Sequence, residues 1–187
     1  MRKTLFAVVC ALVMCLPVLA QNKPAGPPAT VSAILDRSLS NMEHEFVPAA
    51  EAMPEDKFNY APTNGEFKGV RTFGQQVKHV AATNYQIAAA LLGEKPPAGT
   101  EGENGPDTLK SKAEIVKYLK DSMAYAHKAF ASVNDGNATG SIPAPWGTGK
   151  VSRLGISMLL VSHCFDHYGQ MVEYLRSNGI VPPASRQ

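Results

Sequence analysis

The helical spacing of apolar residues most constrains what this chain folds into. Apolar side chains return at three- and four-residue steps in four segments of about 20 to 28 residues, so each segment predicts a helix with one apolar face. No segment alternates with period two over a useful length, which argues against a sheet. Four amphipathic helices joined by Gly- and Pro-rich loops predict an all-α fold, a four-helix bundle. The predicted helices span about 30–53, 72–93, 111–134 and 150–178.

Capping patterns indicate where several of these helices begin and end. Thr72 with Gln75, and Ser111 with Glu114, match capping boxes, in which both side chains satisfy free backbone amides. Gly179 follows the last segment and is a strong stop signal, because glycine readily adopts the left-handed conformation that ends a helix. These signals define the starts of the second and third helices and the end of the fourth.

Pro48 lies inside the first segment and predicts a kink or a short second piece there. The loops between the segments are long, at about 54–71, 93–110 and 136–149. Loops of this length are able to cross an end of the bundle, so the sequence does not predict a simple up-and-down order of the helices.

Residues 1–20 have the pattern of a secretory signal peptide. Arg2 and Lys3 form a basic start, an apolar run follows, and small residues precede Gln21. Two alternatives are an uncleaved anchor, for which the apolar run is short, and a lipoprotein, for which the residues before Cys15 lack the expected small side chain. The pattern therefore predicts export to the periplasm or the extracellular space, with cleavage after residue 20.

Cleavage leaves a neutral chain, because it removes two of the 18 Lys and Arg residues and none of the 16 Asp and Glu residues. A neutral chain without a basic cluster argues against nucleic-acid binding. No later stretch approaches the roughly 18 apolar residues of a membrane span. Cys164 is the one remaining cysteine, so an internal disulfide is excluded. Residues 21–29 form a Pro/Gly-rich leader, 30–183 the bundle and 184–187 a tail.

His163 and His167 form the most informative pair in the sequence. Residues four apart on a helix have Cβ atoms roughly 6 Å apart, so both imidazoles reach one metal ion. Both histidines also lie on the apolar stripe of the fourth segment. The alternatives are two core histidines hydrogen-bonded to neighbours, or a rotated stripe that leaves them solvated. Cys164 stands where a zinc protease of the H-E-x-x-H type has its glutamate, which excludes that enzyme class.

The stretch VSHCFDHYGQMVEYLRSNGIVPP, together with TFGQQVKHVAATNYQIAAALLG, resembles the DinB family of four-helix-bundle metalloproteins. In that family a histidine on the second helix joins an H-x₃-H pair on the fourth. These positions correspond to His79, His163 and His167, and the resemblance covers about 30–183. It implies a DinB-like bundle that binds one divalent transition metal through the three histidines, with zinc or nickel favoured over iron. It also implies a homodimer.

His79 is the residue on which periodicity and resemblance disagree. Its face of the predicted helix carries polar residues, namely Gln75, Gln76, Thr83 and Gln86. Periodicity alone therefore predicts a solvated histidine. The resemblance instead implies a metal ligand, and the same polar residues would then line the metal cavity.

The resemblance also suggests a function. Three neutral imidazoles leave at least one coordination position open. Relatives with this architecture include transferases and isomerases that use low-molecular-weight thiols, which implies a metal-dependent thiol S-transferase acting on small molecules. Export argues against this function, because such thiols are mainly cytosolic. The alternatives are a metal-water hydrolase of small molecules and a non-catalytic metal-binding stress protein. The sequence shows no positioned general base or nucleophile, so it predicts no catalytic residue.

The remaining reactive residues favour structural interpretations. His44 is predicted to be solvated, and His127 to lie at the edge of the third helix's apolar face without acting as a fourth ligand. Cys164 is predicted to be a small packed residue, and Asp166 a surface carboxylate. Trp146, the only tryptophan, is predicted to anchor its loop on the bundle end; the alternative is a wall of the substrate cavity.

Overall fold

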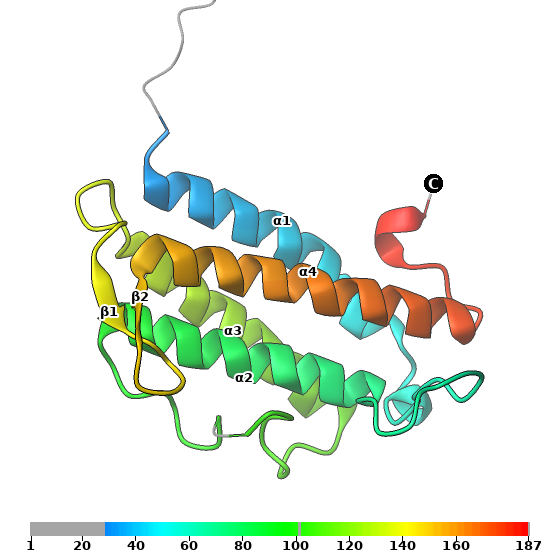
Figure 1. Ribbon diagram of the computed structural model, residues 1–187. Helices are drawn as coiled ribbons and strands as arrows, with labels where there is room; N and C mark the ends of the chain where they lie inside the picture. Colours follow the sequence, from blue (N-terminus) through cyan, green and yellow to red (C-terminus); the bar gives the residue numbers. More distant parts are fainter. Residues whose placement is uncertain (1–28, 101, 187) are drawn as a thin grey trace, which may run out of the picture.

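The computed structural model describes residues 29–100 and 102–186, and it confirms the predicted four-helix bundle (Figure 1). The predicted signal peptide at 1–20 lies outside the described residues. Within the part of the chain that is described, no helix combines the length and the apolar character that a membrane span requires. The elements in chain order are α1 (Val31–Ala52), η1 (Glu55–Lys57), α2 (Phe73–Leu92), α3 (Lys112–Ala131), β1 (Ser141–Pro143), β2 (Lys150–Ser152), α4 (Arg153–Ser177) and η2 (Pro183–Ser185).

The capping boxes predicted for α2 and α3 both form. The Thr72 side chain accepts a hydrogen bond from the backbone amide of Gln75, and the Gln75 side chain accepts one from the Thr72 amide at 2.8 Å. Ser111 and Glu114 make the same reciprocal pair at the start of α3. Gly93 ends α2 with a φ of 71°, the left-handed conformation that only glycine adopts without strain.

α1 continues through Pro48 as one helix, so the second piece predicted there does not form. Proline lacks the amide that would bond to the carbonyl of the residue four positions before it, which is His44. His44 is exposed, as predicted, so water is able to replace the missing donor. α1 ends before Pro54, which precedes the single turn of η1.

The fourth helix begins three residues later than predicted, because residues 150–152 form strand β2 instead. β2 pairs antiparallel with β1, with Ile142 opposite Val151. Ser152 then caps α4, since its side chain accepts a hydrogen bond from the Gly155 amide at 3.1 Å. The strands are three residues long, which is too short to give a recognisable alternating pattern in the sequence.

The helices do not follow an up-and-down order around the bundle. α1 packs against α3 and α4, and α2 packs against the same two helices, so consecutive helices α1 and α2 lie diagonally opposite. α2 and α3 run in the same direction, and the 93–110 connection returns along the outside of α2 (Figure 1). α4 runs antiparallel to α2 (Figure 1). The long loop predicted at 93–110 therefore spans the length of the bundle and covers one face of α2.

The core lies between the four helices and is built from the apolar stripes predicted for them. It includes fully buried large side chains from each helix, among them Phe46, Phe73, Leu119 and Leu160. Several polar side chains are buried as well, and those of α2 include Gln76 and Asn84. Buried polar groups need hydrogen-bond partners, which makes the polar groups between α2 and α4 the natural place to look for a site.

Candidate metal centre

The structure brings together the three histidines predicted as metal ligands. His79 lies on α2, and His163 and His167 lie one turn apart on α4. The Nε2 atom of His163 is 3.0 Å from Nε2 of His79 and 3.1 Å from Nε2 of His167. Among the described residues, these three form the one group of three or more His, Cys, Asp or Glu side chains able to hold a metal ion, with ligand atoms within 4.8 Å of one another.

These distances suit a single small metal ion. Zinc binds imidazole nitrogen at about 2.0–2.1 Å, and tetrahedral geometry then separates two ligand nitrogens by about 3.3 Å. The observed separations of 3.0 and 3.1 Å need a widening of only a few tenths of an ångström. The three ring centroids lie 4.5 to 4.9 Å apart, so the rings already surround one point.

The tautomer of His79 is set by a backbone group. Its Nδ1 donates a hydrogen bond to the main-chain carbonyl of Glu103. A carbonyl oxygen only accepts, so Nδ1 carries the proton and Nε2 keeps its lone pair for the centre of the cluster. Periodicity predicted a solvated His79, and the structure instead finds it half-buried between α4 and the 93–110 connection.

The tautomer of His167 is set by a chain of three side chains. The exposed carboxylate of Asp166 accepts from Nε2 of Gln170 at 3.3 Å. Oε1 of Gln170 accepts from Nε2 of Gln76 at 2.8 Å, and Oε1 of Gln76 accepts from Nδ1 of His167 at 2.5 Å. Because a carboxylate only accepts, it fixes the direction of both amides and leaves Nε2 of His167 unprotonated. Asp166 lies on the surface, as predicted, but it acts on the site through two glutamines.

The three Nε2 atoms of the cluster do not carry enough protons to hydrogen-bond one another. Nδ1 of His163 is buried and has no hydrogen-bond partner among the described residues. Its Nε2 faces two lone pairs, those of His79 and His167, and one N–H is able to satisfy only one of them. A cation between the three Nε2 atoms would satisfy all of them at once, which is the arrangement found in histidine metal sites.

The electrostatics keep the three imidazoles neutral near pH 7. Burial, together with the neighbouring His167 and His79 and with Arg71, lowers the pKa of His163 to about 3. Burial, together with His79 and Arg71, lowers the pKa of His167 to about 4. Burial also lowers the pKa of His79. A metal ion binds the unprotonated ring, so the ligands are in the required state without losing a proton.

The acceptor for His79 is held in place by Arg71. Nε of Arg71 donates to Oδ1 of Asn104 at 2.8 Å, and its terminal nitrogen lies 3.3 Å from the Glu103 carboxylate. Arg71 precedes the capping box of α2, so it links the start of that helix to residues 102–106, here called the Glu103 segment. The link positions the Glu103 carbonyl against His79.

The Glu103 segment also needs a glycine to approach α2. Gly105 has a φ of +65°, and a Cβ on it would lie 2.8 Å from the main-chain oxygen of Lys78. Nζ of Lys78 donates to the carbonyl of Pro106 at 3.0 Å, which fastens the far end of the segment. The segment is therefore attached on both sides of the carbonyl that His79 uses.

A cavity of about 690 Å³ opens beside His79 and His163. Trp146 forms part of its wall, which corrects the prediction that this tryptophan only anchors its loop on the bundle end. The indole Nε1 donates to Oε1 of Gln86, so the ring is tied to the same helix that carries His79. Trp146 and Gln86 were both named from the sequence, but no sequence pattern predicted that the 136–149 loop lies over this part of α2.

The sequence profile of the DinB superfamily matches residues 38–171. That range is more than half of the chain and includes all three histidines. The chain belongs to the DinB superfamily. The family predicted from the two histidine-bearing helices is therefore confirmed.

Two solved structures share the DinB-like fold. One is a DinB-like protein from Bacillus cereus, with a TM-score of 0.66 and 17% sequence identity over 83% of this chain and 97% of that one. The other is a conserved protein from Enterococcus faecalis, with a TM-score of 0.63 and 18% identity over 78% of this chain and 95% of that one. No curated protein sequence matches this chain. At these identities the likeness shows the DinB fold alone.

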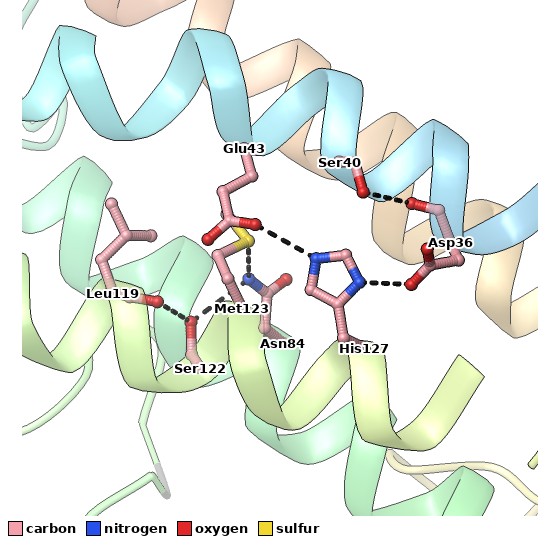
Figure 2. A network of polar contacts seen from close by, with 8 residues as sticks. All are labelled: Asp36, Ser40, Glu43, Asn84, Leu119, Ser122, Met123 and His127. Carbon is pink, nitrogen blue, oxygen red and sulfur yellow. Dashed lines mark hydrogen bonds and ion pairs between the residues drawn. The ribbon is translucent and has the colours of Figure 1, made fainter. Parts of the chain in front are cut away.

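His127 lies away from this centre of the DinB bundle, as predicted. Its Nδ1 is 2.6 Å from a carboxylate oxygen of Asp36, and its Nε2 is 3.1 Å from one of Glu43 (Figure 2). Both carboxylates belong to α1, so this histidine joins α3 to α1. Its ring nitrogens are thus occupied between α3 and α1, whereas the three clustered histidines lie on α2 and α4.

Cys164 is a packed core residue of the DinB bundle, as predicted. It is fully buried, and its Sγ lies 3.5 Å from Oδ1 of Asn84. Burial raises the pKa of its thiol to about 12, so the reactive thiolate does not form near neutral pH. Burial thus keeps the sulfur in the thiol form, and Cys164 is not part of the group of His79, His163 and His167.

Proposed function

We propose that this DinB-superfamily protein binds one divalent transition metal ion through Nε2 of His79, His163 and His167. The observation that carries the proposal is the convergence of three Nε2 atoms, two of them left unprotonated by acceptors on the opposite side of the ring. Neutral nitrogen ligands suit zinc and nickel, with iron(II) a further choice.

Metal analysis of the purified protein tests this site. We expect close to one equivalent of zinc or nickel per chain after reconstitution, and loss of that metal in His163→Ala and His167→Ala. His127→Ala is the matched control, because His127 contacts Asp36 and Glu43 on another face of the bundle. Protein that stays metal-free after reconstitution would refute the proposal.

The reaction that we propose is a metal-dependent S-transfer, in which a whole thiol becomes bonded through its sulfur to a small electrophile. Three protein ligands leave a coordination position open, and His79 and His163 line the cavity of about 690 Å³. A metal ion bound there would lower the pKa of an incoming thiol, so that its thiolate forms near neutral pH. The cavity walls would hold the electrophile beside it and exclude water.

An S-transfer assay tests the reaction directly. A simple thiol loses its proton to the buffer, and the thiolate attacks the chlorine-bearing ring carbon of 1-chloro-2,4-dinitrobenzene. A sulfur–carbon bond forms, the carbon–chlorine bond breaks, and chloride leaves. We expect the zinc-loaded protein to accelerate product formation relative to His163→Ala, which lacks a ligand but keeps the cavity. Equal rates for the two proteins would contradict a metal-dependent transfer.

A metal-water hydrolase is the second candidate, because Glu103 is among the residues that line the cavity. Its carboxylate pairs with Arg71 at 3.3 Å and is a candidate general base. Glu103→Gln keeps the main-chain carbonyl that His79 uses and removes the carboxylate. Loss of ester hydrolysis with unchanged metal content in this variant would favour the hydrolase.

We also propose that the protein is exported and that residues 1–20 are removed. The support is the basic start, apolar run and small residues before Gln21. Protein recovered from the producing cells outside the cytoplasm should begin at Gln21, as read by N-terminal sequencing. A mature protein that begins at Met1 would overturn this part of the proposal.

A further inference from the structure

The cavity beside the three histidines has two facing walls of helical residues. α2 contributes His79, Thr83 and Gln86, at steps of four and three residues, so they share one face. With a rise of 1.5 Å per residue, Gln86 lies about 10 Å from His79 along the helix axis. α4 contributes His163 and, one turn earlier, Leu159. The cavity therefore extends from the histidines toward the β1–β2 hairpin.

Trp146 lies at the hairpin end of this cavity, in the connection between β1 and β2. Its Nε1 donates to Oε1 of Gln86, and the amide of Ala144 donates to the carbonyl of Gly149 at 2.9 Å beside the paired strands. Because the one polar atom of the indole is used, the ring offers apolar and π contact to whatever fills the cavity. Trp146 is 46% exposed, so part of its surface is accessible to a ligand.

Most polar groups in the cavity wall already bond to one another. Nε2 of Gln86 donates to the carbonyl of Thr100, and the Thr100 hydroxyl donates to the carbonyl of Pro97 at 2.7 Å. Thr83 carries the other hydroxyl among the described residues in the wall, and it takes no part in these bonds. A ligand in the cavity therefore finds one hydroxyl partway along it and apolar surface beyond.

No Lys or Arg is among the described residues that line the cavity. Glu103 is the one described lining residue with a side chain that is charged near pH 7. Arg71 is the nearby cation, and its guanidinium is already tied to Asn104 and Glu103. A carboxylate or phosphate at the far end of a ligand would lose water without gaining an opposite charge.

We propose that the cavity selects small ligands with a metal-binding donor atom at one end and an uncharged, flat apolar body. The donor atom lies at the three histidines, and the body packs between Trp146 and Leu159. The donor end of this proposal rests on the proposed metal site, while the selection of the body rests on the cavity wall alone. Thiols with anionic tails are thereby disfavoured as substrates.

Two thiols with the same two-carbon arm test the selection. 2-Phenylethanethiol carries a phenyl ring where 3-mercaptopropionate carries a carboxylate. Trp146 is the only tryptophan of the chain, so its fluorescence reports on this cavity alone. We expect the zinc-loaded protein to bind 2-phenylethanethiol about tenfold to a hundredfold more tightly, with a change in Trp146 emission, because burial of a phenyl ring supplies that difference.

Variants at two neighbouring positions of α4 separate the cavity from the surface. Leu159 lines the cavity and is 45% exposed, whereas Met158 is 61% exposed and lies outside it. We expect Leu159→Lys to reverse the preference toward 3-mercaptopropionate, and Met158→Lys to leave it unchanged. In calorimetric titrations, Trp146→Ala should lose the preference for the phenyl thiol. An unchanged preference in Leu159→Lys would overturn the proposal.

The outcomes also distinguish this proposal from the metal site. If zinc binds and the two thiols bind equally well to the wild-type protein, the selection by the cavity is refuted and the metal site stands. If zinc does not bind, the proposed function fails. Titration of 2-phenylethanol into the metal-free protein then tests whether the cavity selects a flat apolar body. A change in Trp146 emission that is lost in Leu159→Lys then supports the selection, and no change in the wild-type protein overturns it.

Discussion

Nε2 of His79 lies 3.0 Å from Nε2 of His163, although 84 residues separate the two histidines along the chain. α2 and α4 run antiparallel at this point, and the pair Gln76–Gln170 crosses between them at 2.8 Å. The same contact that joins the helices therefore also orients His167. Gln76 therefore both holds α2 against α4 and orients a metal ligand.

Replacing Gln76 should weaken metal binding without emptying the site. Gln76→Leu removes the acceptor for Nδ1 of His167, so the ring is free to adopt the wrong tautomer. Loss of such a supporting partner typically costs about tenfold to a hundredfold in metal affinity. Competition with a chelator measures the change. Gln86→Leu is the control, since Gln86 lies on the same helix and bonds to Trp146 and Thr100; equal losses in both variants would argue against a role for the amide.

Arg71 should influence metal affinity through the Glu103 segment. Arg71→Gln weakens the attachment of Asn104 and Glu103, and we expect a loss of roughly tenfold in metal affinity. Arg153→Gln is a matched control. Arg153 donates a hydrogen bond to the main-chain carbonyl of Leu91 at 2.7 Å, at the opposite end of α2 from Arg71. In a background of His79→Ala, Arg71→Gln should cause little further loss, as a double-mutant cycle would show.

Gly105→Ala should destabilise the protein more than a comparable glycine substitution elsewhere. The new Cβ meets the Lys78 carbonyl at 2.8 Å in addition to the strain of a positive φ. Gly69 has a φ of +80° with no atom within 4 Å of the added Cβ, so Gly69→Ala carries the backbone strain alone. We expect about 1 kcal/mol of destabilisation for Gly69→Ala and about 2–3 kcal/mol for Gly105→Ala, measured by urea unfolding. Only the latter should also lower metal affinity.

The metal-free protein should lose stability below about pH 6.5. Burial places the pKa of His163 at about 3 and that of His167 at about 4, below the ordinary value of 6.5. As pH falls from 6.5, the unfolded chain binds protons before the folded one does, so the free energy of unfolding decreases until the pH passes the folded values. Urea midpoints at pH 7.5 and pH 5 measure this loss. His163→Ala should show a smaller difference between the two pH values than wild type.

The sequence predicted best what local chemistry determines. Thr72, Gln75 and Gly93 set the ends of α2 through groups a few residues apart, and the structure confirms them. Strands β1 and β2 were missed, since three residues give no periodic signal. The bundle was predicted from the apolar faces of the four helices, and the two strands contribute nothing to that pattern. Missing the strands therefore left the bundle prediction unchanged.

The candidate site was predicted only in part, for a different physical reason. His163 and His167 share one helix, so their spacing alone brings them together. His79 faces polar residues, and only its packing against α4 makes it part of the cluster. The Glu103 carbonyl had no signal at all, because a main-chain oxygen is present at every residue and only the path of the loop brings this one to His79.

The same-direction arrangement of α2 and α3 has a kinetic consequence. Because the 93–110 connection must return along α2 before α3 docks, and α4 follows later in the chain, the three histidines meet only after contacts between distant segments have formed. Interactions that form after the folding transition state change the unfolding rate and leave the folding rate nearly unaltered. Metal binding should therefore slow the unfolding of the bundle and leave the folding rate of the chain nearly unchanged.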